Sequence, residues 1–297
     1  NVANAPCSWG VLEFGLDGET DEYQKVLDEM ATTGYRGTEL GDWGFMPTDP
    51  AQLAQELQER KLNLVGAFVP VNFVNPDAHE KGLQTALKTA RLLAEVDGEN
   101  ARIVLSDDNG NDPVRTRNAG RIQREHGLDT DQWNTFSEGV EHVAGSVLEK
   151  TGVSSVFHHH CAGYVETPEE IEIFLELCDS ELVGLCFDTG HYRYGGGDPL
   201  RGLEKFAERI DHIHFKDFDP SVAEKATEND WGYFEAVEHG VFCELGEGSI
   251  DFEAILGELK RIDYSGWIVV EQDILPGMGS PKESAQRNRE FLHTIGI

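Results

Sequence analysis

The feature that most limits the fold of this chain is a regular alternation of short apolar runs with segments of helical periodicity. The alternation occurs eight times, and the apolar runs have the length and composition of β-strands. Strands that alternate with helices form parallel sheets, because each helix carries the chain back to the start of the next strand. The sequence therefore predicts one (β/α)8 barrel, a single domain over 1–297. The expected strands are 3–9, 37–40, 63–70, 101–106, 154–160, 183–189, 210–216 and 267–272.

Helix-start signals fit the same pattern. Thr167 is followed by Pro168 and two glutamates, which supplies a cap, a proline in the first turn and acids near the positive end of the helix dipole. Ser280 and Pro281 repeat this arrangement before the last helix. A doubly wound sheet is the alternative fold, but no Gly-x-Gly-x-x-Gly motif follows any expected strand. The clearest helical segments are 23–33, 50–61, 83–96, 131–150, 168–179 and 252–262.

Charge and composition narrow the classes of partner. The formal net charge is −31, which repels phosphates, so we expect no nucleic-acid binding. The chain contains no apolar run of eighteen residues and no basic-then-apolar start, so we expect neither a membrane span nor a targeting segment. The five cysteines form no Cys-x-x-Cys pair, which favours reduced thiols and a cytoplasmic location.

Two long segments interrupt the alternation. One spans 107–130 after the fourth expected strand, and the other spans 219–247 after the seventh. Both follow the C-terminal end of a strand, so both are expected to overhang the active face of the barrel. The second is rich in aromatic residues, and we expect it to form a lid or a subunit contact in a homo-oligomer. Its aromatic residues are Trp231, Tyr233, Phe234 and Phe242.

Histidines and carboxylates gather at the ends of the last four expected strands. Six of the eleven histidines lie between positions 158 and 214. Asp188, His214 and Glu271 lie at the ends of strands six, seven and eight, and Glu166 follows strand five. Three carboxylates and one imidazole suit a divalent metal, with Mn²⁺ favoured and Co²⁺, Mg²⁺ or Zn²⁺ as alternatives. Taken singly, Asp188 could instead cap a turn, and His214 could be a hydrogen-bonded core residue.

With these residues in place, the chain resembles the xylose-isomerase-like barrels, which include inosose dehydratase, sugar isomerases and sugar epimerases. The triple-histidine run and the Asp-Thr-Gly-His segment are most similar to inosose dehydratase. The resemblance covers almost the whole chain. It is carried by Ala5-Pro-Cys-Ser-Trp9-Gly10, Gly37-Thr-Glu39-Leu-Gly41, His158-His-His160 with Val165-Glu166-Thr167, Phe187-Asp188-Thr-Gly-His191, Gly196-Gly-Asp198-Pro199, His212-Ile-His214-Phe-Lys216-Asp217, Gly246-Glu-Gly248-Ser-Ile-Asp251-Phe252, and Tyr264-Ser-Gly266-Trp267 with Val270-Glu271-Gln272-Asp273.

The resemblance implies a single metal held by Glu166, Asp188, His214 and Glu271. Many members carry the strand-five glutamate closer to the strand, at the place that His158 or His160 occupies in this sequence. In that register a histidine replaces Glu166 as the first ligand, and the sequence leaves this choice open.

The family resemblance also implies a substrate that is a polyol bearing a ketone. A metal polarises the ketone, a base removes the neighbouring proton, and an acid either protonates a departing hydroxyl or returns the proton to a carbon. Candidate bases are Glu166, Glu271 and His191, because a histidine with a pKa near neutrality suits proton transfer. Lys216 could stabilise an enediolate oxygen or form a buried ion pair with Asp217 or Asp188. The expected substrate-binding residues are Glu39, His158, His160 and Trp9, with Phe68 as a second apolar wall. Glu39 and one of the two histidines could instead orient a neighbouring group, and Trp9 and Phe68 could instead pack in the core.

Four functions compete at this level. The favoured one is a metal-dependent lyase that removes water from an inosose-like cyclic keto-polyol. The nearest alternative is a metal-dependent sugar isomerase or epimerase acting on a ketose through an enediolate. A DNA-repair endonuclease shares a related barrel but needs more zinc ligands and a basic groove, which the negative charge opposes. A barrel that only senses a sugar is the fourth, and the apparently intact ligand set argues against it.

Overall fold

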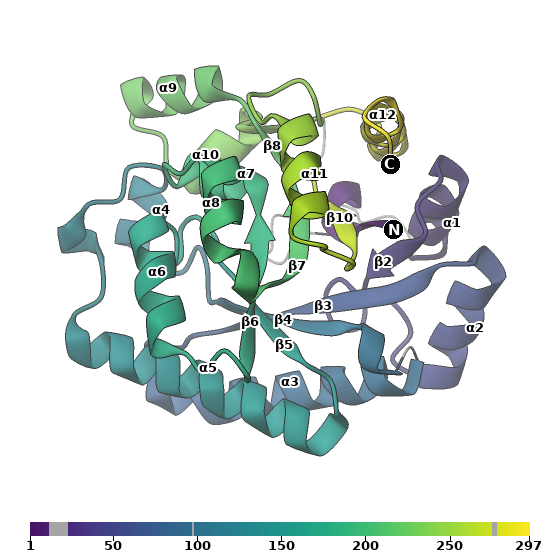
Figure 1. Cartoon of the computed structure of the whole chain (residues 1–297), viewed down its shortest axis with the longest axis horizontal. Helices are drawn as coiled ribbons and strands as arrows, with labels where there is room; N and C mark the ends of the chain where they lie inside the picture. Colours follow the sequence, from purple (N-terminus) through teal and green to yellow (C-terminus); the bar gives the residue numbers. More distant parts are fainter. Residues whose placement is uncertain (12–22, 97, 275–277) are drawn as a thin grey trace.

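The computed structural model describes residues 1–11, 23–96, 98–274 and 278–297. Eight parallel strands form a closed barrel in the order β1-β10-β7-β6-β5-β4-β3-β2, which confirms the predicted (β/α)8 architecture (Figure 1). The barrel strands are β1 (Val2–Asn4), β2 (Gly37–Glu39), β3 (Asn63–Val71), β4 (Arg102–Asp107), β5 (Ser155–His158), β6 (Val183–Asp188), β7 (Ile210–Phe215) and β10 (Ile268–Val270). A separate pair of short antiparallel strands is formed by β8 (Asp217–Phe218) and β9 (Phe242–Cys243).

Helices surround the barrel, and the long α3 and α5 run side by side along one flank (Figure 1). Apolar side chains between the barrel and the helices form the main core. The helices are α1 (Tyr23–Thr33), α2 (Pro50–Arg60), α3 (Pro76–Val96), α4 (Pro113–Asn118), α5 (Thr130–Thr151), α6 (Pro168–Leu177), α7 (Thr189–Tyr194), α8 (Pro199–Phe206), α9 (Pro220–Asn229), α10 (Tyr233–Glu238), α11 (Phe252–Arg261) and α12 (Pro281–Thr294). Four short 3₁₀ helices are η1 (Pro6–Trp9), η2 (Gly98–Asn100), η3 (Arg124–His126) and η4 (Ala207–Arg209).

Strand register aligns the ends of the last strands. The Cα of Asp188 pairs with that of His214, and Val270 pairs with Phe215. The backbone N–H of Glu271 donates to the carbonyl of Phe215 over 3.0 Å, which extends the ladder by one residue. Side chains alternate along a strand, so Asp188 and His214 point to the inside at one level. Glu271 lies two residues beyond Val269, the partner of His214, and points to the inside just above them. The barrel therefore presents three of the predicted ligands at one end.

Several strands end earlier than the sequence suggested, and two of these early ends shape the site. The first was expected over 3–9, but β1 stops at Asn4 because Pro6 has no N–H to donate and opens the helix η1. The fifth was expected over 154–160, but β5 stops at His158. The chain then turns back, and the N–H of His160 donates to the carbonyl of Val165 over 3.0 Å.

The predicted start of α6 has the expected geometry. The hydroxyl of Thr167 accepts from the N–H of Glu170 over 3.2 Å, and the carboxylate of Glu170 accepts from the N–H of Thr167 over 3.0 Å. This reciprocal capping satisfies two N–H groups that the helix itself cannot pair. The same carboxylate forms a buried ion pair with Arg115 of α4 over 2.7 Å, which ties the segment after β4 to the start of α6.

The segments after β4 and β7 carry short helices of their own. Helix α4 lies in the first, and α9 and α10 in the second cover the upper end of the barrel (Figure 1). Asp217 anchors the second segment, since its carboxylate accepts from the N–H groups of Phe218, Gly246, Gly248 and Ile250 over 2.8 to 3.2 Å. Asp217, one of the two ion-pair partners that the sequence suggested for Lys216, thus accepts hydrogen bonds from the backbone instead.

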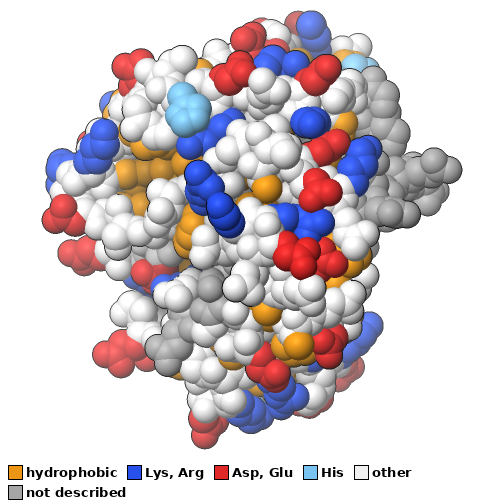
Figure 2. Space-filling view, turned by 90° about the vertical axis from the view of Figure 1, so that its right-hand side faces the viewer, with side chains coloured by type: hydrophobic (Ala, Val, Ile, Leu, Met, Phe, Trp, Pro, Cys, Tyr) orange, Lys and Arg blue, Asp and Glu red, His pale blue; other side chains and the backbone are white. Residues whose placement is uncertain are grey.

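Figure 2 shows acidic and basic side chains interspersed over one face, without a continuous basic area. That distribution fits a solvated surface rather than a groove that attracts phosphates. Among the described residues, no helix combines the length and apolar content required to cross a membrane.

Candidate metal centre and active site

Four side chains from neighbouring strands meet inside the upper end of the barrel. His158, Asp188, His214 and Glu271 can each offer one ligand atom, and these atoms all lie within 4.8 Å of one another. His158 Nε2 is 3.7 Å from Asp188 Oδ2, and His214 Nδ1 is 3.8 Å from the same oxygen and 3.4 Å from Glu271 Oε1. Donors at about 2.0 to 2.2 Å from one metal are separated from each other by roughly 3.0 to 3.6 Å. The measured separations are close to that range.

Two of these donor atoms are buried without a hydrogen-bond partner. They are Asp188 Oδ2 and His214 Nδ1. A buried carboxylate oxygen or imidazole nitrogen without a partner is unfavourable unless something else satisfies it. Burial and the neighbouring His214 lower the pKa of His158 to about 3. The ring of His158 is therefore neutral and can donate a lone pair. The donor set and its unpaired atoms therefore fit a divalent cation.

Two other groups of side chains include His214, one with Glu39 and His212 and one with Cys186 and His158, and both fit a cation less well. Glu39 Oε1 accepts from His212 Nε2 over 2.7 Å and from His214 Nε2 over 3.0 Å, which are hydrogen-bond lengths. Cys186 also lies near His158 and His214. Burial raises the pKa of Cys186 to about 12, which keeps its thiol protonated and a poor ligand.

The structure does not bring Glu166 to this group. Its two carboxylate oxygens accept from the N–H groups of Gly120 and Ala162 over 2.7 and 2.8 Å. Glu166 follows the turn after β5, so its side chain holds the segment after β4 instead of facing Asp188. The geometry thus departs from the expectation that Glu166 is the first ligand and a base, and it favours the alternative register, in which His158 takes that place.

Glu166 makes folding stability depend on pH. Burial, which outweighs Arg115 and the two backbone donors, raises its pKa from an ordinary 4.5 to about 7. The folded protein therefore holds a proton that the unfolded chain loses, and stability falls as pH rises from about 4.5 through 7. We expect this residue to lower the free energy of unfolding by about 3 kcal/mol over that window.

Urea unfolding at pH 5 and pH 8 measures this effect. The wild-type protein should lose about 2 to 3 kcal/mol more than Glu166→Gln between the two pH values, since the amide does not titrate. Asp107, whose pKa burial raises to about 6, contributes equally to both proteins and cancels. An equal loss of unfolding free energy in the two proteins would contradict the raised pKa of Glu166.

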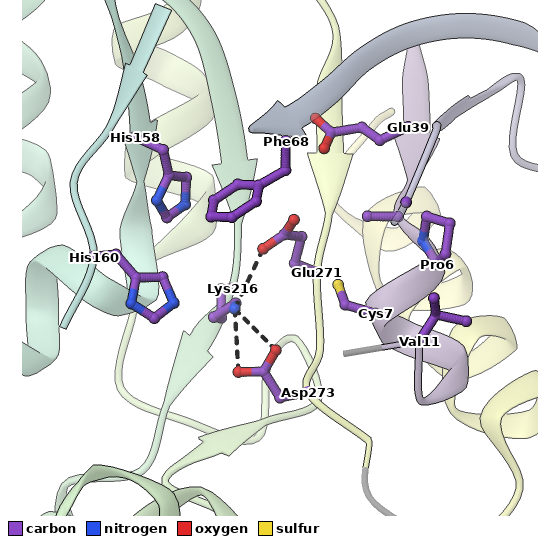
Figure 3. Close-up of a pocket in the computed structure, with 12 residues that line it drawn as sticks. Pro6, Cys7, Val11, Glu39, Phe68, His158, His160, Lys216, Glu271 and Asp273 are labelled. Carbon is purple, nitrogen blue, oxygen red and sulfur yellow. Dashed lines mark hydrogen bonds and ion pairs between the residues drawn. The ribbon is translucent and has the colours of Figure 1, made fainter. Parts of the chain in front are cut away.

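Lys216 lies at the floor of the pocket between two carboxylates. Its Nζ is 3.3 Å from Glu271 Oε2 and 3.3 Å from Asp273 Oδ2 (Figure 3). Burial alone would lower the pKa of Lys216, but Asp273, Glu271 and Asp188 raise it well above its usual value. The ammonium therefore stays charged, and it forms its direct ion pairs with Glu271 and Asp273 instead of the Asp217 or Asp188 suggested by the sequence. Asp273 was not predicted as a site residue, although its spacing of two from Glu271 places both on one side of the chain.

The three consecutive histidines have different environments. His158 and His160 both line the pocket, as Figure 3 shows. His159 points the other way, and its Nε2 accepts from the N–H of Asp188 over 3.1 Å. His159 thus fixes the backbone at the candidate ligand, a role that the sequence did not predict. Alternation of side chains about His158 was the signal that could have found it.

His191 lies behind the pocket wall rather than at its surface. Its ring packs on His160 with centroids 3.8 Å apart, and its Nε2 is 3.4 Å from Lys216 Nζ. The side chain is fully buried. This arrangement allows His191 to position Lys216 and His160, whereas direct contact with a substrate was the expectation from the sequence.

The pocket in front of these residues has about 550 Å³ of empty space, open solvent at its mouth included. Phe68 and Cys7 contribute to its walls (Figure 3). Trp9 does not, contrary to the expectation that it binds substrate: its indole is buried in the core, and Nε1 donates to Glu29 Oε2 over 2.8 Å. The 3₁₀ helix at Pro6 turns this side chain away from the barrel mouth.

Aromatic residues of the segment after β7 pack against His160, which lines the pocket, and against His191 behind it. The hydroxyl of Tyr233 lies 3.4 Å from His160 Nε2, and Phe242 packs edge-on against His191 at 4.7 Å. Both aromatic side chains are buried. Tyr233 and Phe242 therefore support the histidines of the pocket wall, and neither lines the pocket itself. The sequence had identified the segment but could not assign individual contacts.

The sequence profile of the xylose isomerase-like TIM barrel family matches residues 27–295 of the chain. The chain belongs to this family. The inosose dehydratase of Geobacillus kaustophilus (strain HTA426) is 34% identical over 299 residues, covering 99% of this chain and 94% of that protein. Two solved structures share the fold, a protein called IOLI with a bound zinc atom (17% identity, TM-score 0.71) and L-ribulose 3-epimerase (16% identity, TM-score 0.71). Both matches extend over 99% of this chain. They cover 97% of the IOLI chain and 93% of the L-ribulose 3-epimerase chain. Family and relatives together support an enzyme that modifies sugars.

Proposed function

We propose that this family member is a metal-dependent lyase that dehydrates an inosose-like cyclic keto-polyol. The observation that carries the proposal is the pair of buried, unpaired donor atoms, Asp188 Oδ2 and His214 Nδ1, beside His158 and Glu271. These four residues would hold a divalent cation, with Mn²⁺ favoured by the mixed oxygen and nitrogen donors. When bound, such a cation polarises a ketone and acidifies the neighbouring C–H bond.

The side chains around that position supply the proton transfers. Glu271 directs Oε1 towards His214 and Oε2 towards Lys216, so Oε2 is the oxygen placed to take a proton from carbon. The Lys216 ammonium faces the same side and would stabilise the enediolate oxygen or protonate the departing hydroxyl. His191 and Asp273 hold that ammonium in place. Proton removal and hydroxyl loss can thus occur on one face of the ring.

This one-sided arrangement favours dehydration over the alternative epimerisation. Inverting one carbon requires a proton acceptor and a proton donor on opposite faces of the substrate. Glu166 and Glu271 were the carboxylates expected to act as bases, but Glu166 is bound to the backbone N–H groups of Gly120 and Ala162. Glu271 and Lys216, by contrast, lie 3.3 Å apart.

The charges lining the pocket indicate an uncharged substrate. Of the described lining residues, Lys216 is the only lysine or arginine, and it is paired with Glu271 and Asp273. Positions 12–22 and 275–277 contain no lysine or arginine in the sequence. A phosphorylated sugar would therefore meet carboxylates without a free counter-charge. A neutral keto-polyol meets no such repulsion.

The test is turnover of scyllo-inosose, followed through the absorbance of the dione product. We expect the dione to form, to stop forming after treatment with a chelator and to return after Mn²⁺ is added. Interconversion of ketoses without any dione would support the epimerase alternative. Unchanged turnover after removal of all divalent metal would contradict both.

Glu39 is proposed to position His214 rather than to bind substrate. Its Oε1 accepts from Nε2–H of His214 over 3.0 Å, which leaves the lone pair on Nδ1, the atom facing Asp188 and Glu271. Gly66 makes room for this carboxylate, because a Cβ there would come within 3.1 Å of Oε1. Carboxylates that orient a ligand histidine in this way strengthen metal binding.

Replacing Glu39 with glutamine is expected to weaken Mn²⁺ binding by about 10- to 100-fold. The measurement is competition with a chromophoric chelator on metal-free protein, which does not depend on catalysis. Glu253→Gln, a change in the first turn of α11, is the matched control and should leave the affinity unchanged. An unchanged affinity in Glu39→Gln would show that Glu39 does not act on His214.

A further inference from the structure

A second hollow adjoins the candidate active site. It contains about 620 Å³ of empty space, open solvent included, and shares Phe68 with the first pocket. Its walls combine two aromatic rings, Phe68 and Phe234, with the polar side chains of Asp108, Asn109 and Asn111. None of the described lining residues is a lysine or an arginine. The proposed reaction uses none of these polar groups.

Hydrogen bonds connect the floor of this hollow to the candidate metal ligand. Asn109 Nδ2 donates to Ser106 Oγ over 2.8 Å, and Ser106 Oγ donates to the carbonyl of His158 over 2.9 Å. The ring of Phe68 stands edge-on to that of His158, with centroids 6.1 Å apart. The hollow therefore begins one side chain away from the reacting centre.

The other wall of the hollow is linked to the active site through α10. Phe234 follows Tyr233 in α10, and their rings meet edge-on at 5.4 Å. Tyr233 in turn reaches His160. The same short helix thus places one aromatic ring against His160 and the next one in the second hollow.

The polar rim is fixed by contacts of its own. The N–H of Gly110 donates to the carbonyl of Ala162 over 3.0 Å, and Asn111 Nδ2 donates to Asp108 Oδ1 over 2.6 Å. Asp112 caps α4 directly after this turn. A rim held in this way has its polar groups in place before a ligand arrives, which lowers the entropy lost on binding.

We propose that this hollow binds a second, uncharged hydroxylated ring joined to the keto-polyol through a glycosidic oxygen. The proposal rests on the function proposed above and extends its substrate class from free keto-polyols to glycosides of keto-sugars. The ring's C–H faces would pack on Phe68 and Phe234, and its hydroxyls would donate to Asp108 and exchange hydrogen bonds with Asn111. The carboxylate of Asp108 and the absence of a lysine or arginine among the described lining residues disfavour a phosphate or carboxylate substituent.

The experiment compares two competitive ligands against scyllo-inosose turnover by the metal-loaded enzyme. They are 3-keto-D-glucose, with one ring, and the corresponding 3-keto derivative of cellobiose, with the ketone on its non-reducing ring. We expect the two-ring ketone to bind about five- to tenfold more tightly. Phe234→Ala should remove that advantage and leave both the one-ring inhibition constant and scyllo-inosose turnover within twofold of wild type.

Two further variants keep the test decisive. Asn111→Ala changes an exposed rim residue outside the core and should weaken only the two-ring ketone, even if Phe234→Ala lowers the melting temperature. Val114→Ala, at a half-exposed position on α4 outside the hollow, should change neither constant. Equal affinities for the two ketones, or an equal loss for both in Phe234→Ala, would overturn the second site. Failure of scyllo-inosose turnover itself would overturn the proposed function instead.

Discussion

Replacing Asp188 with asparagine should reduce kcat/KM by at least about 10³-fold, which corresponds to roughly 4 kcal/mol of lost transition-state stabilisation. The carboxylate plays two separable roles. Oδ1 accepts from the N–H of His191 over 2.7 Å and caps α7, whereas Oδ2 is the unpaired atom facing His158 and His214. Asparagine keeps an oxygen for the cap and removes the negative charge, so the fold should persist while metal affinity is lost.

Elemental analysis and steady-state kinetics on the same preparation measure the effect of Asp188→Asn. The control is Asp198→Asn, which alters an exposed cap of α8 outside the site. The control should retain full metal content and activity. A fully metal-loaded and active Asp188→Asn protein would remove Asp188 from the proposed ligand set.

Replacing Lys216 with methionine should lower kcat by about 10²- to 10⁴-fold while a metal still binds. The ammonium is the only cation among the described pocket residues, and it lies 3.3 Å from both Glu271 and Asp273. Methionine has a similar length but cannot donate a proton or stabilise an oxyanion. The two carboxylates would then share the site without a cation, so a loss of stability is also expected.

Comparison of kcat with metal content separates chemistry from binding in Lys216→Met. Lys216→Arg retains the charge and should keep the fold while recovering only part of kcat, because the planar guanidinium presents its donors differently. Lys205→Met, at an exposed ion pair with Glu172, is the neutral control. A kcat within threefold of wild type in Lys216→Met would exclude Lys216 from the reaction.

The strand-five position shows where inference from the sequence failed. Glu166 has the residue type and approximate place of a family ligand, and it follows the expected strand 154–160. The turn after β5 returns the chain, with His160 paired to Val165, so Glu166 leads into α6 rather than the barrel mouth. His158, the last residue of β5, faces inward instead.

The sequence by itself determined the eight-unit barrel, since alternation of apolar runs and helical segments leaves few other folds. It also determined that Asp188, His214 and Glu271 lie together, because residues at the C-terminal ends of neighbouring parallel strands point into the same end of the barrel. These are consequences of local periodicity and strand register. They needed no knowledge of how distant segments pack.

Only the tertiary structure decided which of the remaining polar side chains share the site. Glu39 reaches His214 across the barrel, from 175 positions away in the sequence, and Tyr233 reaches His160 from a segment 73 positions away. Asp273 pairs with Lys216, although Asp217 is the neighbour of Lys216 in the sequence. Such contacts depend on loop paths and on competition among several nearby partners, and the energies that settle this competition arise only when the side chains are packed together.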